Sequence, residues 1–134
     1  MEFIKTPDEK ICEILSVSDG TAKLLYESGE IGYWPEESLL QLSAVDVIQV
    51  FEKVLDNHID AVAQAKGYDS RLTCALRAGY VNVWQSEGIA FGQWMDACYE
   101  QAFQMMNDYL AEAPGAPTTK AEFSAALPVM VWPE

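Results

Sequence analysis

The fold is decided by the stretch SAVDVIQVFEKVLDNHIDAVAQAKG, which runs from Ser43 to Gly67. Between Val47 and Val62 its apolar residues recur at spacings of three and four, and most of its charged residues fall on the other side. This pattern predicts an amphipathic helix. Ser43 is suited to cap the start of that helix, and Gly67 is suited to the position just beyond its end.

Further helices are expected after this stretch. Asp69-Ser70 can cap a second helix that runs to Gly79, and Thr118-Thr119 can cap a short last helix. Between them, a segment from about residue 83 to residue 113 carries one broad apolar stripe, as expected for a helix buried on more than one side. The stripe consists of Trp84, Gly88, Phe91, Met95, Cys98, Ala102, Met105, Met106 and Tyr109. We expect this segment to be the central helix.

The first 43 residues have a different character. Three short segments read as strands, separated by the turn signals Asp19-Gly20 and Ser28-Gly29. The segments are Ile11–Val17, Ala22–Tyr26 and Glu30–Trp34. We therefore predict an α+β fold, with a small β-meander in an N-terminal part (residues 1–43) and a mainly helical C-terminal domain (residues 44–134) that has one long central helix. Because about 43 residues make a marginal core alone, packing of the two parts together stays open.

The charge of the chain limits the partners that it can bind. Twenty-one Asp and Glu residues against eight Lys and Arg residues give a formal net charge of −13. This excess argues against nucleic acid, whose phosphates require clustered cations, and against an anionic membrane surface. No apolar run approaches the roughly 20 residues that span a bilayer, and residues 1–10 resemble neither a secretory signal nor a transit peptide. We expect a cytoplasmic protein.

No set of residues has the pattern of an active site or a metal site. His58 is the only histidine and stands in the apolar stripe of the first helix, where a structural role is more common than catalysis. Cys12, Cys74 and Cys98 are widely spaced and flanked by apolar residues, as reduced buried cysteines are. Glycine-rich phosphate loops are absent from the sequence. We therefore predict a protein that is not an enzyme and has no cofactor and no metal.

Glu87 is the acidic residue closest to a functional role. It is in helical register with Phe91 and Trp94, so it is expected to face the interior, where an unpaired carboxylate is costly. We interpret it as a structural anchor whose partner is Arg77 or a tyrosine such as Tyr80. The alternative is an enzyme with a carboxylate site around Glu87.

Two features of the long helical segment have ordinary structural explanations. Gly88 and Gly92 have the GxxxG spacing, which in a soluble protein we interpret as allowing close helix packing. Met95, Met105 and Met106 could form an adaptable binding face, but a methionine stripe at helical spacing is more often part of a core. Neither feature defines a site.

Two surfaces are the candidates for binding another protein. The first is the apolar tail made of Val129, Met130, Val131, Trp132 and Pro133. The tail either docks on the core or binds a partner. The second is the edge of the meander near Trp34, because an unpaired strand can be extended by a strand of another protein.

An ordered set of short elements extends from Ile59 to Pro133. It comprises the segment IDAVAQAKGYDS with Tyr68, then Tyr80, then Glu87 with Trp94 seven residues on, then Pro117-Thr118, Leu127-Pro128 and Trp132-Pro133. In order and spacing these elements resemble the helical module of bacteriophage tail-fibre assembly chaperones and tail-region accessory proteins. We interpret Tyr68, Tyr80, Glu87 and Trp94 as structural anchors of this module. That family often has Trp-Arg in the long helix, whereas this chain has Trp94-Met95, so no role of that arginine is carried over.

The resemblance implies a non-enzymatic phage protein that binds a tail-fibre or tail component in the host bacterial cytoplasm and assists its folding or assembly. An acidic exterior suits such a protein because it keeps the complex soluble. The alternative is a minor structural component of the tail or fibre that is retained in the virion. An acidic DNA mimic ranks last, because the charges are spread through both halves of the chain. Whether the protein forms a homo-oligomer stays open.

Overall fold

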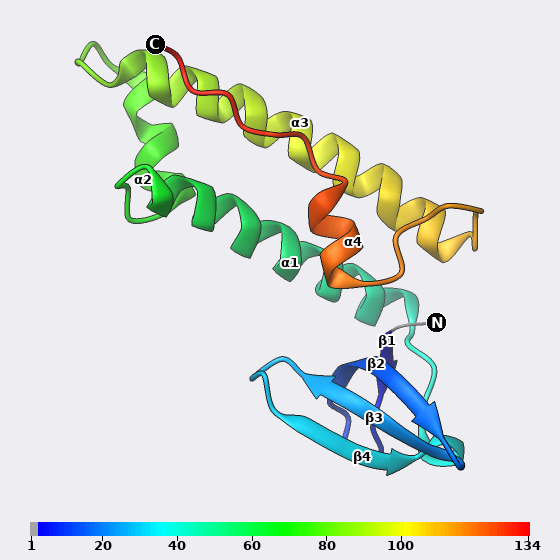
Figure 1. The fold of residues 1–134 in the computed structure, drawn as a ribbon. Coiled ribbons are helices and arrows are strands. Elements are labelled where there is room, and N and C mark those ends of the chain that lie inside the picture. The colour runs from blue at the N-terminus through cyan, green and yellow to red at the C-terminus, as the bar shows by residue number, and fades with distance from the viewer. Residues whose placement is uncertain (1–2) are drawn as a thin grey trace.

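The computed structural model describes residues 3–134 and has two parts, a β-sheet and a group of helices (Figure 1). The antiparallel sheet has the order β1-β2-β3-β4, with strands β1 (Phe3–Lys5), β2 (Ile11–Ser18), β3 (Thr21–Tyr26) and β4 (Ile31–Pro35). The helical elements are α1 (Ala44–Ala65), α2 (Arg71–Leu76), α3 (Gln85–Leu110) and α4 (Lys120–Ala125), with the short 3-10 turns η1 (Glu36–Ser38) and η2 (Arg77–Gly79). The predicted α+β fold, with an N-terminal meander and one long helix, is confirmed.

The strand β1 is an element that the sequence pattern did not predict. It pairs antiparallel with β2, so that Ile4 lies opposite Cys12. The turn between them is closed by the backbone N–H of Thr6, which donates to the carbonyl of Lys10 at 2.9 Å, and Thr6 itself is fully buried. A strand of three residues is too short to show an alternating pattern, so only its pairing identifies it.

The three predicted strands are present, and their turns use glycine as expected. Gly20 and Gly29 have φ values of 75° and 90°, a region that glycine adopts at no steric cost. One face of the sheet builds a small core of its own, made of Ile4, Cys12, Ala22 and Leu24, with Ile14, Tyr26, Trp34 and Leu39 packed around it. The sheet therefore buries side chains independently of the helices.

Side-chain caps mark the starts of three helices at the predicted residues. At α1, the Asp46 N–H donates to Ser43 Oγ at 3.1 Å, and Asp46 Oδ2 accepts from the Ser43 N–H at 3.1 Å. Ser70 and Thr119 begin α2 and α4 in the same reciprocal way. Gly67, with a φ of 103°, lies just beyond α1 as predicted. The helix α3 is shorter at both ends than the predicted residues 83–113: Trp84 has a non-helical backbone conformation before its start, and Glu112, with a φ of 55°, breaks the helical backbone after its end.

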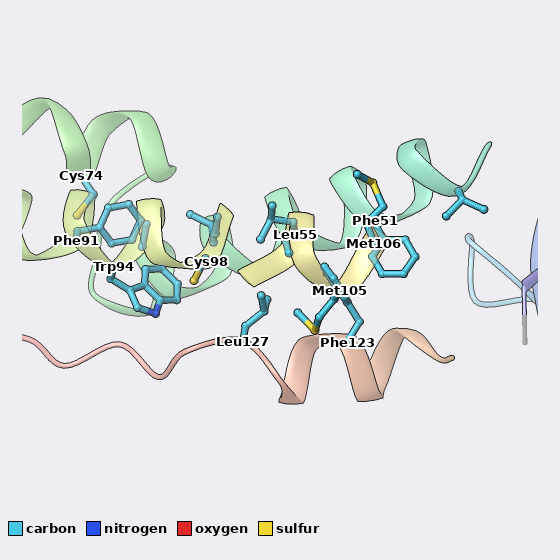
Figure 2. Close-up of a cluster of buried hydrophobic side chains, with 14 residues drawn as sticks. Phe51, Leu55, Cys74, Phe91, Trp94, Cys98, Met105, Met106, Phe123 and Leu127 are labelled. Atoms are coloured by element: carbon cyan, nitrogen blue, oxygen red, sulfur yellow. The ribbon is translucent and has the colours of Figure 1, made fainter. Parts of the chain in front are cut away.

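The core of the helical part lies between α1 and α3, which run antiparallel, and α4 with the C-terminal tail, which covers them (Figures 1 and 2). Its largest buried side chains include Phe51, Leu55, Ile59, Phe91, Trp94, Cys98, Met105, Met106, Phe123 and Leu127. The rings of Phe51 and Phe123 meet edge to face with centroids 4.6 Å apart. Burial of Met105 and Met106 supports the interpretation of the methionines as core.

The sheet and the helices contact each other through a group of aromatic rings. Phe3 of β1 is buried against Phe51 of α1 and Tyr109 of α3, at centroid distances of 6.5 Å and 6.3 Å. The carboxylate of Glu13 accepts a hydrogen bond from the backbone N–H of Lys120 at 2.9 Å. These contacts pack the two parts against each other. That each part is a separate domain stays a prediction.

Candidate protein-binding surface

The C-terminal tail, the first predicted binding surface, docks on the protein's own helices. After α4 the chain runs in extended form along α3 towards the start of that helix (Figure 1, red). Its side chains alternate: Met130 and Trp132 pack against the helical core, whereas Val129 is 84% exposed and Val131 is 78% exposed. The sequence leaves open whether the tail docks on the core or binds a partner, and in the structure it docks on the core. Pro133 is exposed at the end of the tail.

Two tryptophans fasten the tail. The Trp94 Nε1–H donates to the carbonyl oxygen of Pro128 at 2.7 Å. The ring of Trp132 stacks on Phe91 with centroids 5.9 Å apart and an interplanar angle of 14°, and Lys66 Nζ lies 5.3 Å from its centroid. The hydrogen bond from Trp94 and the stacked ring of Trp132 therefore hold the tail on the helices. Both tryptophans belong to the ordered set of sequence elements between Ile59 and Pro133.

Trp34, the second predicted binding residue, is largely committed to the sheet. It is half-buried against the core of the sheet, and its Nε1–H donates to Tyr26 Oη at 2.7 Å. The strand β4 is an edge of the sheet, and the side chains on it that face solvent most are Tyr33, 65% exposed, and Ile31, 44% exposed. A partner that extended this edge would therefore meet Tyr33 and Ile31 more than Trp34.

The tyrosine that bonds to Glu87 is Tyr68, not Tyr80. Tyr68 Oη donates to Glu87 Oε1 at 3.4 Å, whereas the two partners named from the sequence bond to each other, Arg77 Nη1 donating to Tyr80 Oη at 2.6 Å. Burial, followed by the charge of Glu87, raises the pKa of Tyr68. The contact was missed because the loop after α1 brings Tyr68 back to α3, which local spacing does not reveal.

Gly88 lets η2 approach α3 closely. A Cβ atom at Gly88 would lie 2.5 Å from the backbone nitrogen of Ala78, so only glycine fits without movement. The prediction of close packing is thus confirmed for Gly88. It is wrong for Gly92, where an added Cβ would meet no atom within 4 Å.

An exposed apolar surface that the sequence reasoning missed lies at the end of the helices away from the sheet, around α2, η2 and the loop into α3 (Figure 1). We name this surface the distal patch; it consists of Leu72, Leu76, Tyr80, Val81, Val83 and Trp84. Val81 is 92% exposed and Val83 is 82% exposed. Trp84 had been assigned to the buried stripe of the long helix but is about half exposed at its N-cap. A cluster of large exposed apolar side chains commonly marks an interaction surface.

The distal patch also differs in charge from the rest of the protein. Residues 70–86 contain Arg71 and Arg77 but no Asp or Glu, in a chain whose net charge is −13. Arg71 pairs with Asp60 at 2.8 Å and with Asp56 at 3.6 Å. The guanidinium of Arg77 lies 4.9 Å from the ring centroid of Trp84 instead. The acid-free run around Val81 was the signal in the sequence that could have indicated this surface.

The three cysteine thiols are buried and have raised pKa values. Burial raises the pKa of the thiols of Cys12, Cys74 and Cys98 to about 11, so at neutral pH each is a protonated thiol and a weak nucleophile. All three are free and buried, as predicted. Burial lowers the pKa of His58, whose ring lies 6.0 Å from that of Trp94. It borders an open groove between α1 and the tail.

Within residues 3–134, no group of three or more His, Cys, Asp and Glu side chains could hold a metal ion. None of the helices in that range has the length and hydropathy that crossing a membrane requires. Comparisons of the chain with family models, curated proteins and solved structures found no match. The distal patch is therefore defined by its exposure and charge alone.

Proposed function

We propose that this protein acts by binding another protein through the distal patch, and that it is not an enzyme. The observation that carries the proposal is the exposure of Val81 and Val83, together with the lack of acidic residues in the segment 70–86. Burying such side chains against a partner removes apolar surface from water at about 25 cal/mol per Å². An acidic exterior elsewhere keeps a protein with an exposed apolar surface in solution.

We further propose that the partner is a bacteriophage tail-fibre or tail component, whose folding or assembly this protein assists in the host cytoplasm. The support is the ordered pattern from Gly67-Tyr68 to Trp132-Pro133. Its elements account for contacts of the fold: Tyr68 with Glu87, and Trp94 with the tail.

The test is co-expression with the tail-fibre protein of the same phage genome, followed by affinity purification and measurement of soluble fibre. We expect the fibre to co-purify and to be more soluble when this protein is present. The double variant Val81→Ser/Val83→Ser should lose both effects. The matched control Val129→Ser/Val131→Ser, equally exposed but outside the distal patch, should keep them.

Two results would change the proposal. A fibre that folds equally well alone and never binds this protein would refute the assembly role. If the protein is present in purified virions in a fixed ratio to the fibre, the alternative, a minor structural component retained in the particle, replaces the chaperone role.

A further inference from the structure

Arg77 is the one charged side chain at the centre of the distal patch, and the fold leaves it without a counter-ion. Its Nη1 donates to Tyr80 Oη at 2.6 Å, and its guanidinium lies over the ring of Trp84. Its Nε is buried and has no hydrogen-bond acceptor. Within residues 3–134 it takes part in none of the ion pairs. The two aromatic neighbours therefore hold the guanidinium in place, and because Nε is enclosed by the protein itself, a partner would meet the guanidinium through its Nη atoms.

Arg71, the other arginine of the same segment, shows the contrast. It donates to Asp60 through Nη1 at 2.8 Å and through its backbone N–H at 2.9 Å, and it lies near Asp56 as well. Arg71 thus has its carboxylates from α1, within the fold. Arg77 forms no ion pair within residues 3–134: Glu87, whose charge raises the pKa of Tyr68 while that of Arg77 lowers it, bonds to Tyr68 and not to the guanidinium.

From this contrast we infer that the partner segment covering the distal patch is apolar and carries a carboxylate that Arg77 binds. The inference rests on the proposed function, because it takes the distal patch to be the binding surface. Arginine matches a carboxylate with two parallel N–H···O bonds, and apolar surroundings strengthen such bonds by excluding water. The ring of Trp84 lies against the guanidinium, and the exposed Val81 and Val83 belong to the same segment of the chain.

The charge distribution of the protein favours an acidic segment of another protein over a second copy of this chain as the partner at the distal patch. Most of the surface would repel an acidic partner, whereas residues 70–86 carry only positive charge. A second copy of this chain, docked symmetrically, would place one Arg77 patch against another with no carboxylate between them. An isologous contact therefore lacks the charge complementarity that an acidic segment of another protein provides.

The probe is a library of short random peptides displayed for selection on the immobilised full-length protein. We expect the selected peptides to combine large apolar residues with Asp or Glu and to be depleted of Lys and Arg. Two substitutions at one exposed site separate charge from apolar contact, because both remove the same valine side chain: Val81→Glu should weaken the best peptide at least tenfold more than Val81→Lys does, a difference of about 1.4 kcal/mol. Val129→Glu is the matched control and should leave its affinity unchanged.

Arg77 is tested directly with Arg77→Gln, whose stability is measured alongside because Arg77 also contacts Tyr80 and Trp84. Replacing each acidic residue of the best peptide by its amide should weaken binding to wild type and should have little effect on binding to Arg77→Gln. That coupling between one carboxylate and one guanidinium is a result that a merely structural role of Arg77 would not give.

Four outcomes would overturn the inference. They are selection of basic peptides, equal effects of Val81→Glu and Val81→Lys, self-association of wild type that Val81→Glu abolishes, and binding to anionic lipid vesicles that the same substitution abolishes.

A failure of this inference can be distinguished from a failure of the proposed function. If acidic peptides bind as expected but the tail fibre does not, the proposed partner is wrong; if the fibre binds at the distal patch but the peptides are not acidic, only this inference is wrong.

Discussion

The C-terminal tail and the distal patch are both apolar, both lack acidic residues, and both belong to the helical part, yet only the tail has side chains packed against the core. In the tail, Met130 and Trp132 turn inward and leave Val129 and Val131 exposed. In the distal patch, Val81 and its neighbours have no covering element. The difference lies in the anchors: a hydrogen bond from Trp94 and a stack on Phe91 bind the tail to the core. Apolar composition alone does not predict which segment a fold leaves for a partner.

The largest expected effect comes from removing the ring that anchors the tail. Trp132→Ala should lower the free energy of unfolding by about 2–3 kcal/mol, somewhat less than truncation of a fully buried aromatic side chain, because Trp132 is half-buried. Urea denaturation measures the change. Val131→Ala, the exposed neighbour, is the control and should shift stability by less than about 0.5 kcal/mol. Equal effects of the two would mean that the tail is not docked in solution.

A smaller effect is expected at the glycine that positions the distal patch. Gly88→Ala should destabilise the protein by about 1–3 kcal/mol, because its Cβ overlaps the backbone of Ala78. Gly92→Ala, in the same helix with open space around it, should instead stabilise by up to about 1 kcal/mol through helix propensity. Thermal unfolding of the pair tests the packing of η2 on α3. A stabilising Gly88→Ala would contradict it.

The hydrogen bond from Trp94 to the start of the tail is tested by Trp94→Phe. Loss of the bond to the Pro128 carbonyl, together with a smaller ring, should cost about 1–2 kcal/mol. Limited proteolysis should then cleave the tail faster than it cleaves the wild-type tail. The rate of cleavage elsewhere serves as the internal reference, and a general increase would mean that the core, not the tail, had loosened.

The smallest effect is a pH dependence at the helix that leads into the tail. Hydrogen bonds from the Thr118 and Thr119 backbone and side chains lower the pKa of Glu122 below its ordinary 4.5. A lowered folded pKa means that the contribution of Glu122 is complete above pH 4.5 and is lost as the pH falls through the folded value. We expect Glu122→Gln to be less sensitive to acid over that window. Tryptophan fluorescence in a pH titration gives the readout, and identical curves would argue against the cap.

The sequence predicts what depends on a few neighbouring residues. Ser43, Ser70 and Thr119 each cap a helix through bonds that reach only three residues along the chain, so their roles can be read locally. β1 and the bond between Tyr68 and Glu87 depend on residues that the fold brings together from a distance. Spacing within one segment carries no information about such pairs.

The distal patch and the docking of the tail could be predicted only in part, because both depend on contacts between residues that are distant in the sequence. The apolar composition of the tail indicates a surface that is buried somewhere, but whether it packs on the same chain depends on side chains that other elements supply. The apolar stripe predicts that the long helix starts near Val83 with Trp84 in the core, whereas Trp84 lies at the N-cap and is about half exposed. The charge of residues 70–86 was visible in the sequence, but its meaning required knowing which side chains are exposed there.

The burial of Phe3 has a consequence for the order in which the molecule is completed. On the ribosome, Tyr109, one of the rings that enclose Phe3, emerges more than 100 residues after Phe3, and Lys120, whose amide binds Glu13, emerges more than 100 residues after Glu13. The strands can pair before that point, but the contact between them and the helices cannot form until Tyr109 and Lys120 have been synthesised. Until then Phe3 is an exposed aromatic ring on a nascent chain, which is the kind of surface that a ribosome-associated chaperone binds.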